Sequence, residues 1–200
     1  MKIYKYKSYE EYEYSQKKAN QKKAEKTWAV EENIKHISEI LEQEKPVMGL
    51  CHGVRGGNEI LFFRKYLKNC KIFGTEIGEV RNKYTTQWDF NTINPEWIKK
   101  FDFIYSNSYD HAFNPAETLQ VWADQVKPGG YIILEYDKRS EHTGEISKPV
   151  NKVDPVSLTK DELIKFVPEW VKNANVEKVV DMPVVKKHYQ YAVFIKIKKG

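Results

Sequence analysis

The sequence between Val47 and Glu76 constrains the fold more than any other part of the chain. It opens with a short apolar run, Val47–Cys51, which predicts an interior strand because it is too short for a buried helix. The glycine cluster Gly53–Gly57 follows directly and predicts a loop whose backbone takes positive φ or approaches a ligand closely. Apolar residues at helical spacing follow Asn58, the expected N-cap, and give way to a second apolar strand, Lys71–Thr75.

Strand, glycine loop, helix, strand and acid, in this order, are typical of the nucleotide-binding half of a doubly wound α/β sheet. The loop and the helix N-terminus bring backbone N–H groups towards a ligand, and Glu76 can accept both hydroxyls of a ribose. A glycine loop alone is weak evidence, because an ordinary strand-to-helix turn also needs glycine. The rest of the chain has to decide between these two interpretations.

Composition narrows the class of protein. Two hundred residues suit one domain, and a formal net charge of +5 suits an anionic partner without requiring one, since the lysines are spread over the chain. The two cysteines, Cys51 and Cys70, match no metal-ligand spacing and no disulfide framework, so we expect no metal site. With no membrane-length apolar run and no signal-peptide core, we expect a cytoplasmic protein without membrane contact.

The first 28 residues differ from the rest of the chain. Five tyrosines lie before residue 15, and a polar stretch rich in lysine, glutamine and asparagine follows them. We predict a helical arm over residues 1–28, laid across a single domain of residues 29–200. The arm could act as a lid on a ligand site, with Tyr14, Gln16 and Asn20 as candidate contacts. The alternative is a solvated helix held by a few aromatic contacts.

The remainder of the chain alternates strands with amphipathic helices. A helix is predicted between Trp28 and Pro46, a second after Asn114, and a third after the capping box that begins at Thr159. Five further strands are predicted, and these are Thr85–Phe90, Phe101–Tyr105, Tyr131–Tyr136, Val176–Met182 and Tyr189–Lys198. The last two must be antiparallel because the turn between them is too short for a crossover helix. The polar stretch Asp137–Val156 is long for a loop and predicts a functional insertion.

This order of elements resembles the class I S-adenosylmethionine-dependent methyltransferases over residues 29–198. The matching pieces are VMGLCHGVRGG, GTE, QWDF and VKPGGYIILEY, followed by the C-terminal hairpin. Dinucleotide dehydrogenases lack the KPGG-strand and that hairpin in this arrangement. The chain is most similar to small uncharacterised bacterial and phage-type members with a CHGxRxG loop and a SNS(Y/F)DH stretch. The resemblance implies a doubly wound three-layer sandwich, with a seven-stranded, mostly parallel sheet and an antiparallel C-terminal strand.

The resemblance also implies cofactor contacts, with S-adenosyl-L-methionine as the cofactor. Gly53 and Gly57 match the loop glycines that approach its amino-acid part. Glu76 matches the ribose acid, and Ile77 follows it where adenine is bound. Asp89 matches the acid near the adenine amino group, with Phe90 packing on the ring, whereas Trp88 is better explained as core.

Two positions depart from the family's loop pattern. Arg55 stands where a middle glycine is usual, and Cys51 stands where an acid is common. The contacts to the methionine end are therefore open, and Arg55 could itself pair with the cofactor carboxylate. Ser106, at the end of the fourth strand, completes the expected cofactor contacts.

Methyl transfer is an in-line displacement, so catalysis can rest on positioning, with a base only where the acceptor must lose a proton. The loop after the fourth strand lies where ligands bind in such sheets. His111 or Asp110 is the expected general base, and Asn107 is expected to orient the acceptor. The alternative for His111 is a loop or capping role, and His52 and His142 are better explained as structural or exposed.

The loop after the fourth strand restricts the choice of methyl acceptor. Transfer to cytosine C5 would need a cysteine after the fourth strand, which the chain lacks, and Ser106–Tyr109 lacks both prolines of an amino-methylating loop. We therefore expect a small molecule or sugar hydroxyl, enclosed by the arm and the insertion. The alternatives are a nucleic-acid or amine N-methyltransferase, a nucleoside-binding module without catalysis, and an NAD-dependent oxidoreductase. The sequence gives no indication of oligomeric state.

Overall fold

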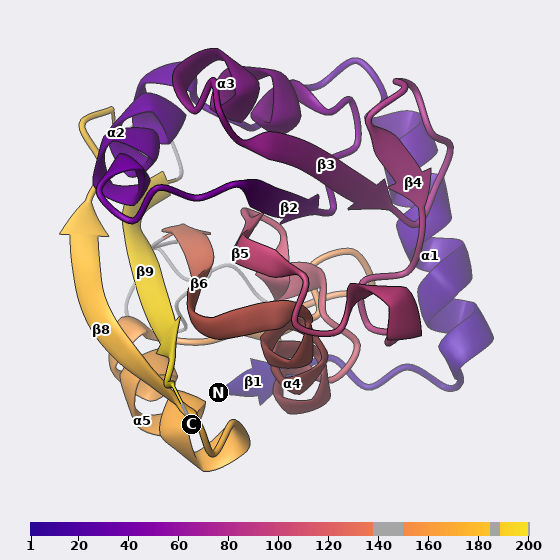
Figure 1. Cartoon of the computed structure of the whole chain (residues 1–200). Coiled ribbons are helices and arrows are strands. Elements are labelled where there is room, and N and C mark those ends of the chain that lie inside the picture. The colour runs from indigo at the N-terminus through magenta and orange to yellow at the C-terminus, as the bar shows by residue number, and fades with distance from the viewer. Residues whose placement is uncertain (138–149, 185–188, 200) are drawn as a thin grey trace.

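The computed structural model describes residues 1–137, 150–184 and 189–199. In these residues, seven strands form one sheet in the order β4-β3-β2-β5-β6-β9-β8 (Figure 1). The strands are β2 (Met48–His52), β3 (Lys71–Glu76), β4 (Thr85–Gln87), β5 (Phe101–Ser106), β6 (Val126–Asp137), β8 (Ala174–Asp181) and β9 (Tyr189–Ile197). Neighbouring strands from β4 to β6 are parallel, whereas β9 runs antiparallel to both β6 and β8. The predicted sheet, with its antiparallel C-terminal strand, is confirmed.

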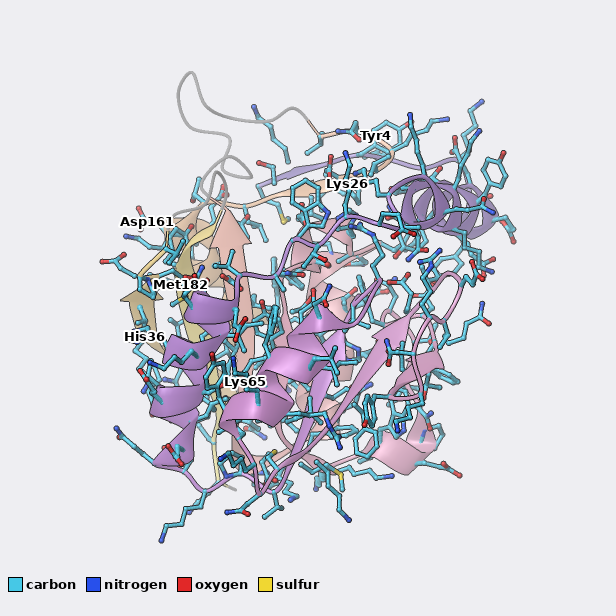
Figure 2. The ribbon with its side chains drawn as sticks, turned by 90° about the horizontal axis from the view of Figure 1, so that it is seen from above. Tyr4, Lys26, His36, Lys65, Asp161 and Met182 are labelled. Carbon is cyan, nitrogen blue, oxygen red and sulfur yellow. The ribbon has the colours of Figure 1, made fainter. Side chains whose placement is uncertain are left out.

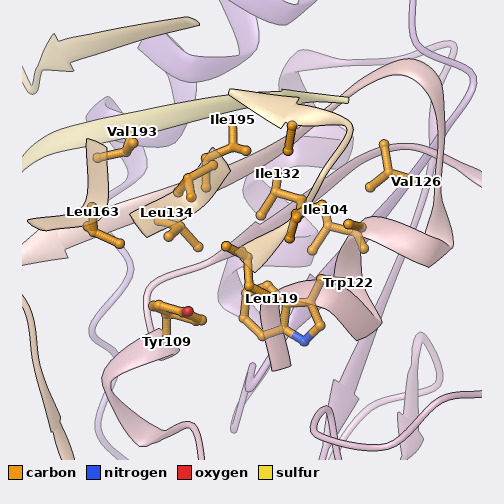
Figure 3. Close-up of a cluster of buried hydrophobic side chains, with 14 of the residues drawn as sticks. Ile104, Tyr109, Leu119, Trp122, Val126, Ile132, Leu134, Leu163, Val193 and Ile195 are labelled. Atoms are coloured by element: carbon orange, nitrogen blue, oxygen red, sulfur yellow. The ribbon is translucent and has the colours of Figure 1, made fainter. Parts of the chain in front are cut away.

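Two pairs of helices cover the two faces of the sheet (Figure 1). Helices α2 (Glu31–Glu42) and α3 (Asn58–Tyr66) bury Ile34, Ile60 and Phe63 against one face. Helices α4 (Pro115–Gln125) and α5 (Lys160–Trp170) pack on the other. There Trp122 and Leu119 meet the sheet side chains shown in Figure 3. The molecule is therefore the three-layer sandwich that the resemblance implies.

Local capping explains where several of these helices begin. Thr159 and Glu162 form the predicted capping box at the start of α5. Asn114 accepts hydrogen bonds from the backbone N–H groups of Ala116 and Glu117 at the start of α4. The expectation for Asn58 is wrong, because Gly57, at a φ of +82°, is the N-cap of α3 and the Asn58 amide donates to Thr27 instead.

Two strand boundaries also differ from the prediction. Strand β4 ends at Gln87 rather than Phe90, because Asp89 begins a turn in which it accepts from the backbone N–H groups of Asn91 and Thr92. Strand β6 begins at Val126, so the glycine pair after α4 is part of the strand. A Cβ on Gly130 would lie 2.4 Å from the carbonyl oxygen of Asp102, which explains the glycine there.

The N-terminal segment crosses the carboxyl ends of the parallel strands. Helix α1 (Tyr9–Lys22) lies beyond the arrowheads of β2 and β3 (Figure 1), and Figure 2 shows it at the side of the molecule away from α2. Strand β1 (Lys2–Ile3) pairs antiparallel with β7 (Val156–Ser157). The tip of the predicted insertion, residues 138–149 with His142, lies outside the described residues. No helix in the described part of the chain is both long and apolar enough to cross a membrane.

Candidate functional site

A cavity lies between α1 and the carboxyl ends of the strands, which is where ligands bind in open α/β sheets. Six of the predicted cofactor residues line it, and these are Gly53, Arg55, Glu76, Ile77, Asp89 and Phe90. His111 and Ser108 line it from the loop after β5. The structure thus brings together, at one place, residues that the sequence assigned separately to three strand ends.

The glycine loop after β2 is held in an unusual backbone conformation. Gly53, Arg55 and Gly57 all take positive φ, at +73°, +45° and +82°. The N–H groups of Gly53 and Val54 donate to the carbonyl oxygen of Thr75, at 2.9 and 3.1 Å, and this ties the loop to β3. For Arg55, which carries a Cβ, such a conformation costs on the order of 1 kcal/mol and so needs compensating contacts.

Glu76 supplies one of these contacts. Its Oε2 accepts from the backbone N–H of Arg55 at 2.7 Å, and its Oε1 accepts from the N–H of Gly78 at 3.0 Å. The side chain is buried but borders the cavity. A carboxylate oxygen can accept a second hydrogen bond, so both oxygens can still bind hydroxyl groups of a ligand. Glu76 therefore holds the shape of the glycine loop and keeps acceptor positions at the cavity.

Asp89 and Phe90 form the opposite wall. Asp89 accepts from the Tyr9 hydroxyl at 2.6 Å and from the backbone and side-chain amides of Asn91 at 2.9 and 2.6 Å. Burial raises the pKa of Tyr9, and the hydrogen bond to Asp89 raises it further. The Tyr9 hydroxyl therefore stays protonated and donates its hydrogen bond. Phe90 is held by Trp122, whose indole N–H donates to the Phe90 carbonyl oxygen at 2.9 Å.

Helix α1 forms the cover of the cavity. Tyr12, Gln16 and Asn20 line it and are buried, as the sequence predicted for the last two. Tyr14 was expected to join them, but this is wrong, because it is 65% exposed on the far side of the helix. The contacts of Tyr9 and Tyr12 were missed. Their spacing of three and four residues along the face with Gln16 and Asn20 is the sequence signal that could have identified them.

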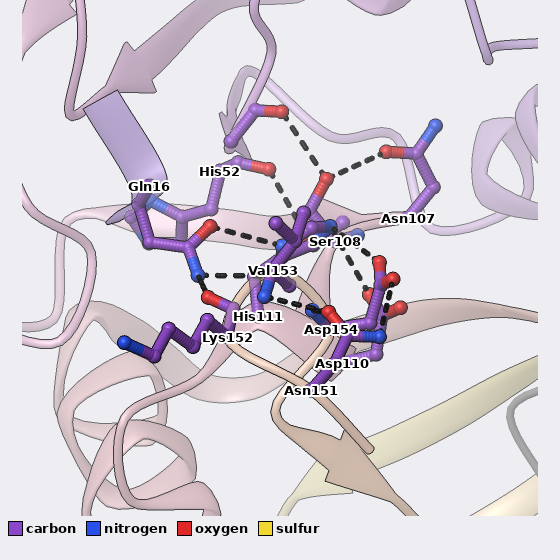
Figure 4. Close-up of polar contacts among 12 residues, drawn as sticks. Gln16, His52, Asn107, Ser108, Asp110, His111, Asn151, Lys152, Val153 and Asp154 are labelled. Atoms are coloured by element: carbon purple, nitrogen blue, oxygen red, sulfur yellow. Dashed lines mark hydrogen bonds and ion pairs between the residues drawn. The ribbon is translucent and has the colours of Figure 1, made fainter. Parts of the chain in front are cut away.

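The predicted catalytic loop lies beside α1. Nδ1 of His111 is hydrogen-bonded to Oε1 of Gln16 at 3.1 Å, and its Nε2 lies 3.7 Å from Asp110 and 3.9 Å from Asp154 (Figure 4). One possible ligand atom from each of Asp110, His111 and Asp154 lies within 4.8 Å of the others, so these three side chains could hold a metal ion. Asp154 belongs to the predicted insertion and was missed as a site residue.

Three predicted cofactor residues do not line the main cavity. Cys51 is fully buried in the core beneath α2 and α3, and burial raises the pKa of its thiol well above the usual value. Ser106 is also fully buried and donates to the His52 carbonyl oxygen at 3.0 Å. Gly57 ends the loop and caps α3. These three residues therefore support the strand ends and the glycine loop and do not line the main cavity.

His52 has the structural role expected for it. Its ring nitrogens are hydrogen-bonded to Thr75 Oγ1 at 2.7 Å and Gln125 Oε1 at 3.0 Å, beneath the glycine loop. Burial lowers the pKa of His52 to about 3, so the imidazole is neutral at physiological pH.

A second cavity, with about 270 Å³ of empty space, lies on the other side of the glycine loop. It shares Gly53, Arg55 and Ser108 with the first, and Asn107 and Glu59 line it as well. Asn107, expected to orient the acceptor, donates to Glu59 Oε1 at 3.5 Å. Burial raises the pKa of Glu59 to about 7. The sequence analysis did not single out Glu59.

No protein-family model and no curated protein sequence matches the chain. Solved structures do match it. A 1,6-didemethyltoxoflavin-N1-methyltransferase from Burkholderia thailandensis, solved with its acceptor and S-adenosylhomocysteine, superposes with a TM-score of 0.74 over 98% of this chain and 93% of that one, at 15% identity. The chain has the class I methyltransferase fold.

Two further methyltransferases show the same likeness. A possible histamine N-methyltransferase from Thermotoga maritima covers 96% of this chain and 94% of its own, with a TM-score of 0.60 and 19% identity. A sugar N-methyltransferase from a Streptoalloteichus species covers 92% of both chains, with a TM-score of 0.64 and 9% identity. At these identities the likeness extends to the fold, and the reaction has to be argued from the site.

Proposed function

We propose that the protein is an S-adenosylmethionine-dependent methyltransferase that acts on a small molecule. The observation that carries this proposal is the convergence of Glu76, Asp89 and the glycine loop on one cavity, at the ligand-binding edge of this fold. When bound, the cofactor would supply a methyl group on a sulfonium, which is already a good leaving group.

The cavity suggests how a nucleoside would lie in it. Glu76 accepts hydrogen bonds from the two ribose hydroxyls. Ile77 and Phe90 offer apolar surface for the adenine ring, and the Asp89 carboxylate lies at the same wall to accept from the adenine amino group. Tyr12 and Asn20 close the cavity from α1. Residues 1–28 would then act as a lid on the domain of residues 29–200.

The enclosure by α1 favours a small acceptor over nucleic acid, because a polymer would have to displace the helix. The solved neighbours support the same choice, since their names give a didemethyltoxoflavin and a sugar as acceptors. The same names describe N-methylation, so a small amine is an alternative to a sugar hydroxyl as the acceptor group. A cytoplasmic location is part of this proposal.

Calorimetry on the purified protein tests the cofactor. We expect S-adenosylmethionine and S-adenosylhomocysteine to bind and NAD to give no heat of binding. Binding of NAD alone would contradict the proposal and support an oxidoreductase. Binding of S-adenosylmethionine without transfer to any acceptor in a broad panel of amines, phenols and sugars would support a nucleoside-binding module instead.

His111 is the proposed general base, Asp110 is the alternative base, and Asn107 is proposed to orient the acceptor. Its imidazole borders the cavity and is oriented by Gln16. We expect His111→Ala to lower the rate of methyl transfer about 100-fold, the usual contribution of a positioned base. Radiolabelled S-adenosylmethionine and the best acceptor of the panel provide the assay.

The matched control is His36→Ala, on the outer face of α2, which we expect to leave the rate unchanged. S-adenosylhomocysteine affinity should be similar in both variants. Full turnover by His111→Ala would remove this residue from the mechanism.

A further inference from the structure

The second cavity contains an unusual group, the side chain of Glu59. Glu59 is only 6% exposed, and Asn107 is the hydrogen-bond partner of its Oε1. Its Oε2 has no hydrogen-bond partner among the described residues. A buried carboxylate oxygen without a partner is costly to the fold, and this cost points to a ligand that supplies the missing donor.

The chemistry around Glu59 indicates what kind of donor that is. Arg55 lines the same cavity, and its positive charge opposes the rise that burial causes in the pKa of Glu59. The charge of Arg55 therefore favours the carboxylate form. The charged side chains that line this cavity are Glu59, Arg55 and Lys26. One carboxylate beside two cationic groups is complementary to a zwitterion, in which an ammonium and a carboxylate lie on one carbon atom. The free amino-acid end of a ligand has this pattern of charges.

The two cavities are neighbours across the glycine loop. Both are lined by Gly53, Arg55 and Ser108, so a single ligand with one end in each cavity would lie along these three residues. A molecule with a nucleoside at one end and an α-amino acid at the other fits this arrangement. S-adenosylmethionine is such a molecule, and in it the sulfur joins the two ends.

We infer that Glu59 binds the α-ammonium group of the cofactor's amino-acid end, while Arg55 faces its carboxylate. This inference rests on the proposed function. Glu59 then has the role of the acidic residue that is common in this family at the position of Cys51. The two residues are close enough for the charge of Glu59 to raise the pKa of the Cys51 thiol, so the carboxylate is supplied from α3 instead of the strand end.

A pair of ligands isolates this contact. S-adenosylhomocysteine carries the amino-acid end, whereas 5′-methylthioadenosine keeps the nucleoside and thioether and lacks it. We expect Glu59→Gln to weaken S-adenosylhomocysteine about 10- to 100-fold, as for loss of a hydrogen bond between charged groups, and to leave methylthioadenosine unchanged. The wild-type preference for S-adenosylhomocysteine should be partly restored in Glu59→Asp.

The control is Glu39→Gln, which removes one exposed carboxylate from α2 and should change neither affinity. Proton linkage gives a second readout. Because Glu59 must be ionised to bind an ammonium, wild-type affinity for S-adenosylhomocysteine should rise between pH 6 and about pH 7.5, the range around its raised pKa, and Glu59→Gln should lack this rise.

Three outcomes would overturn the inference. A folded Glu59→Gln protein that keeps the full preference for S-adenosylhomocysteine would remove Glu59 from the ligand site. If the substitution weakens the binding of S-adenosylhomocysteine and methylthioadenosine equally, its effect is a general disturbance of the protein structure. If the wild-type protein binds neither ligand, the proposed function itself fails, and the inference fails with it.

Discussion

Replacing Glu76 by alanine is expected to weaken S-adenosylhomocysteine binding on the order of 10³-fold. Two hydrogen bonds from ribose to a charged acceptor are worth roughly 3–6 kcal/mol together. The substitution also releases the backbone N–H groups of Arg55 and Gly78, which the two carboxylate oxygens hold at 2.7 and 3.0 Å. Calorimetry measures the affinity, and circular dichroism checks the fold.

Two further variants sharpen this experiment. Glu76→Gln should also bind weakly. Its side-chain NH₂ group would face a backbone N–H group from which the wild-type carboxylate accepts a hydrogen bond. Glu79→Gln is the matched control, since this acid lies three residues further on and is 73% exposed beside Arg81. We expect it to bind normally. A well-folded Glu76→Ala protein with wild-type affinity would refute the assignment of this cavity to the nucleoside.

The second large effect concerns stability and pH. Burial raises the pKa of Glu59 from its usual 4.5 to about 7, so the folded state holds this proton more tightly than the unfolded state. The stability that the protonated group contributes is complete below about pH 4.5 and is lost as the pH rises through about 7. The loss is about 3 kcal/mol for a shift of this size.

Glu59→Gln cannot ionise and should not lose this contribution. Without ligand, the variant should therefore gain about 3 kcal/mol relative to wild type between pH 4.5 and pH 8, measured by urea unfolding at each pH. Acids that do not interact with Glu59 titrate alike in both proteins and cancel in the difference. Glu39→Gln should follow the wild type. A constant difference between Glu59→Gln and wild type would show that the pKa of Glu59 is the same in the folded and unfolded states.

Together these expectations describe a site in which binding is favoured at the expense of stability. Glu59 is buried without a complete set of partners, and Arg55 is held at a φ of +45°. Such local departures from the best packing are typical of functional sites. The ligand would supply the missing partners.

Much of this site could be predicted from the sequence. Gly53 and Glu76 each follow an apolar run, Asp89 lies at the end of the predicted third strand, and the carboxyl ends of parallel strands lie at one edge of a sheet. The antiparallel pairing of β8 with β9 followed from the short connection between them. Patterns of this kind depend on neighbours in the chain, because strand period, caps and turns are set by residues within a few positions of each other.

Other features were decided by the tertiary structure alone. Tyr9 meets Asp89 across 80 residues of sequence, and Gln16 meets His111 across 95. Sequence analysis placed Tyr14 in the lid and Cys51 at the cofactor, whereas the fold exposes the first and buries the second in the core. It also gave no sign of Glu59.

The physical reason is the same in each case. The side chains that α1 presents to the cavity depend on the rotation at which the helix docks, and the burial of Glu59 depends on the packing of α3 beside β2. Both are set by the sum of many long-range contacts, each of them small. The sequence by itself determined the order of the elements and the edge where a ligand binds, and the packing of distant segments determined which side chains meet there.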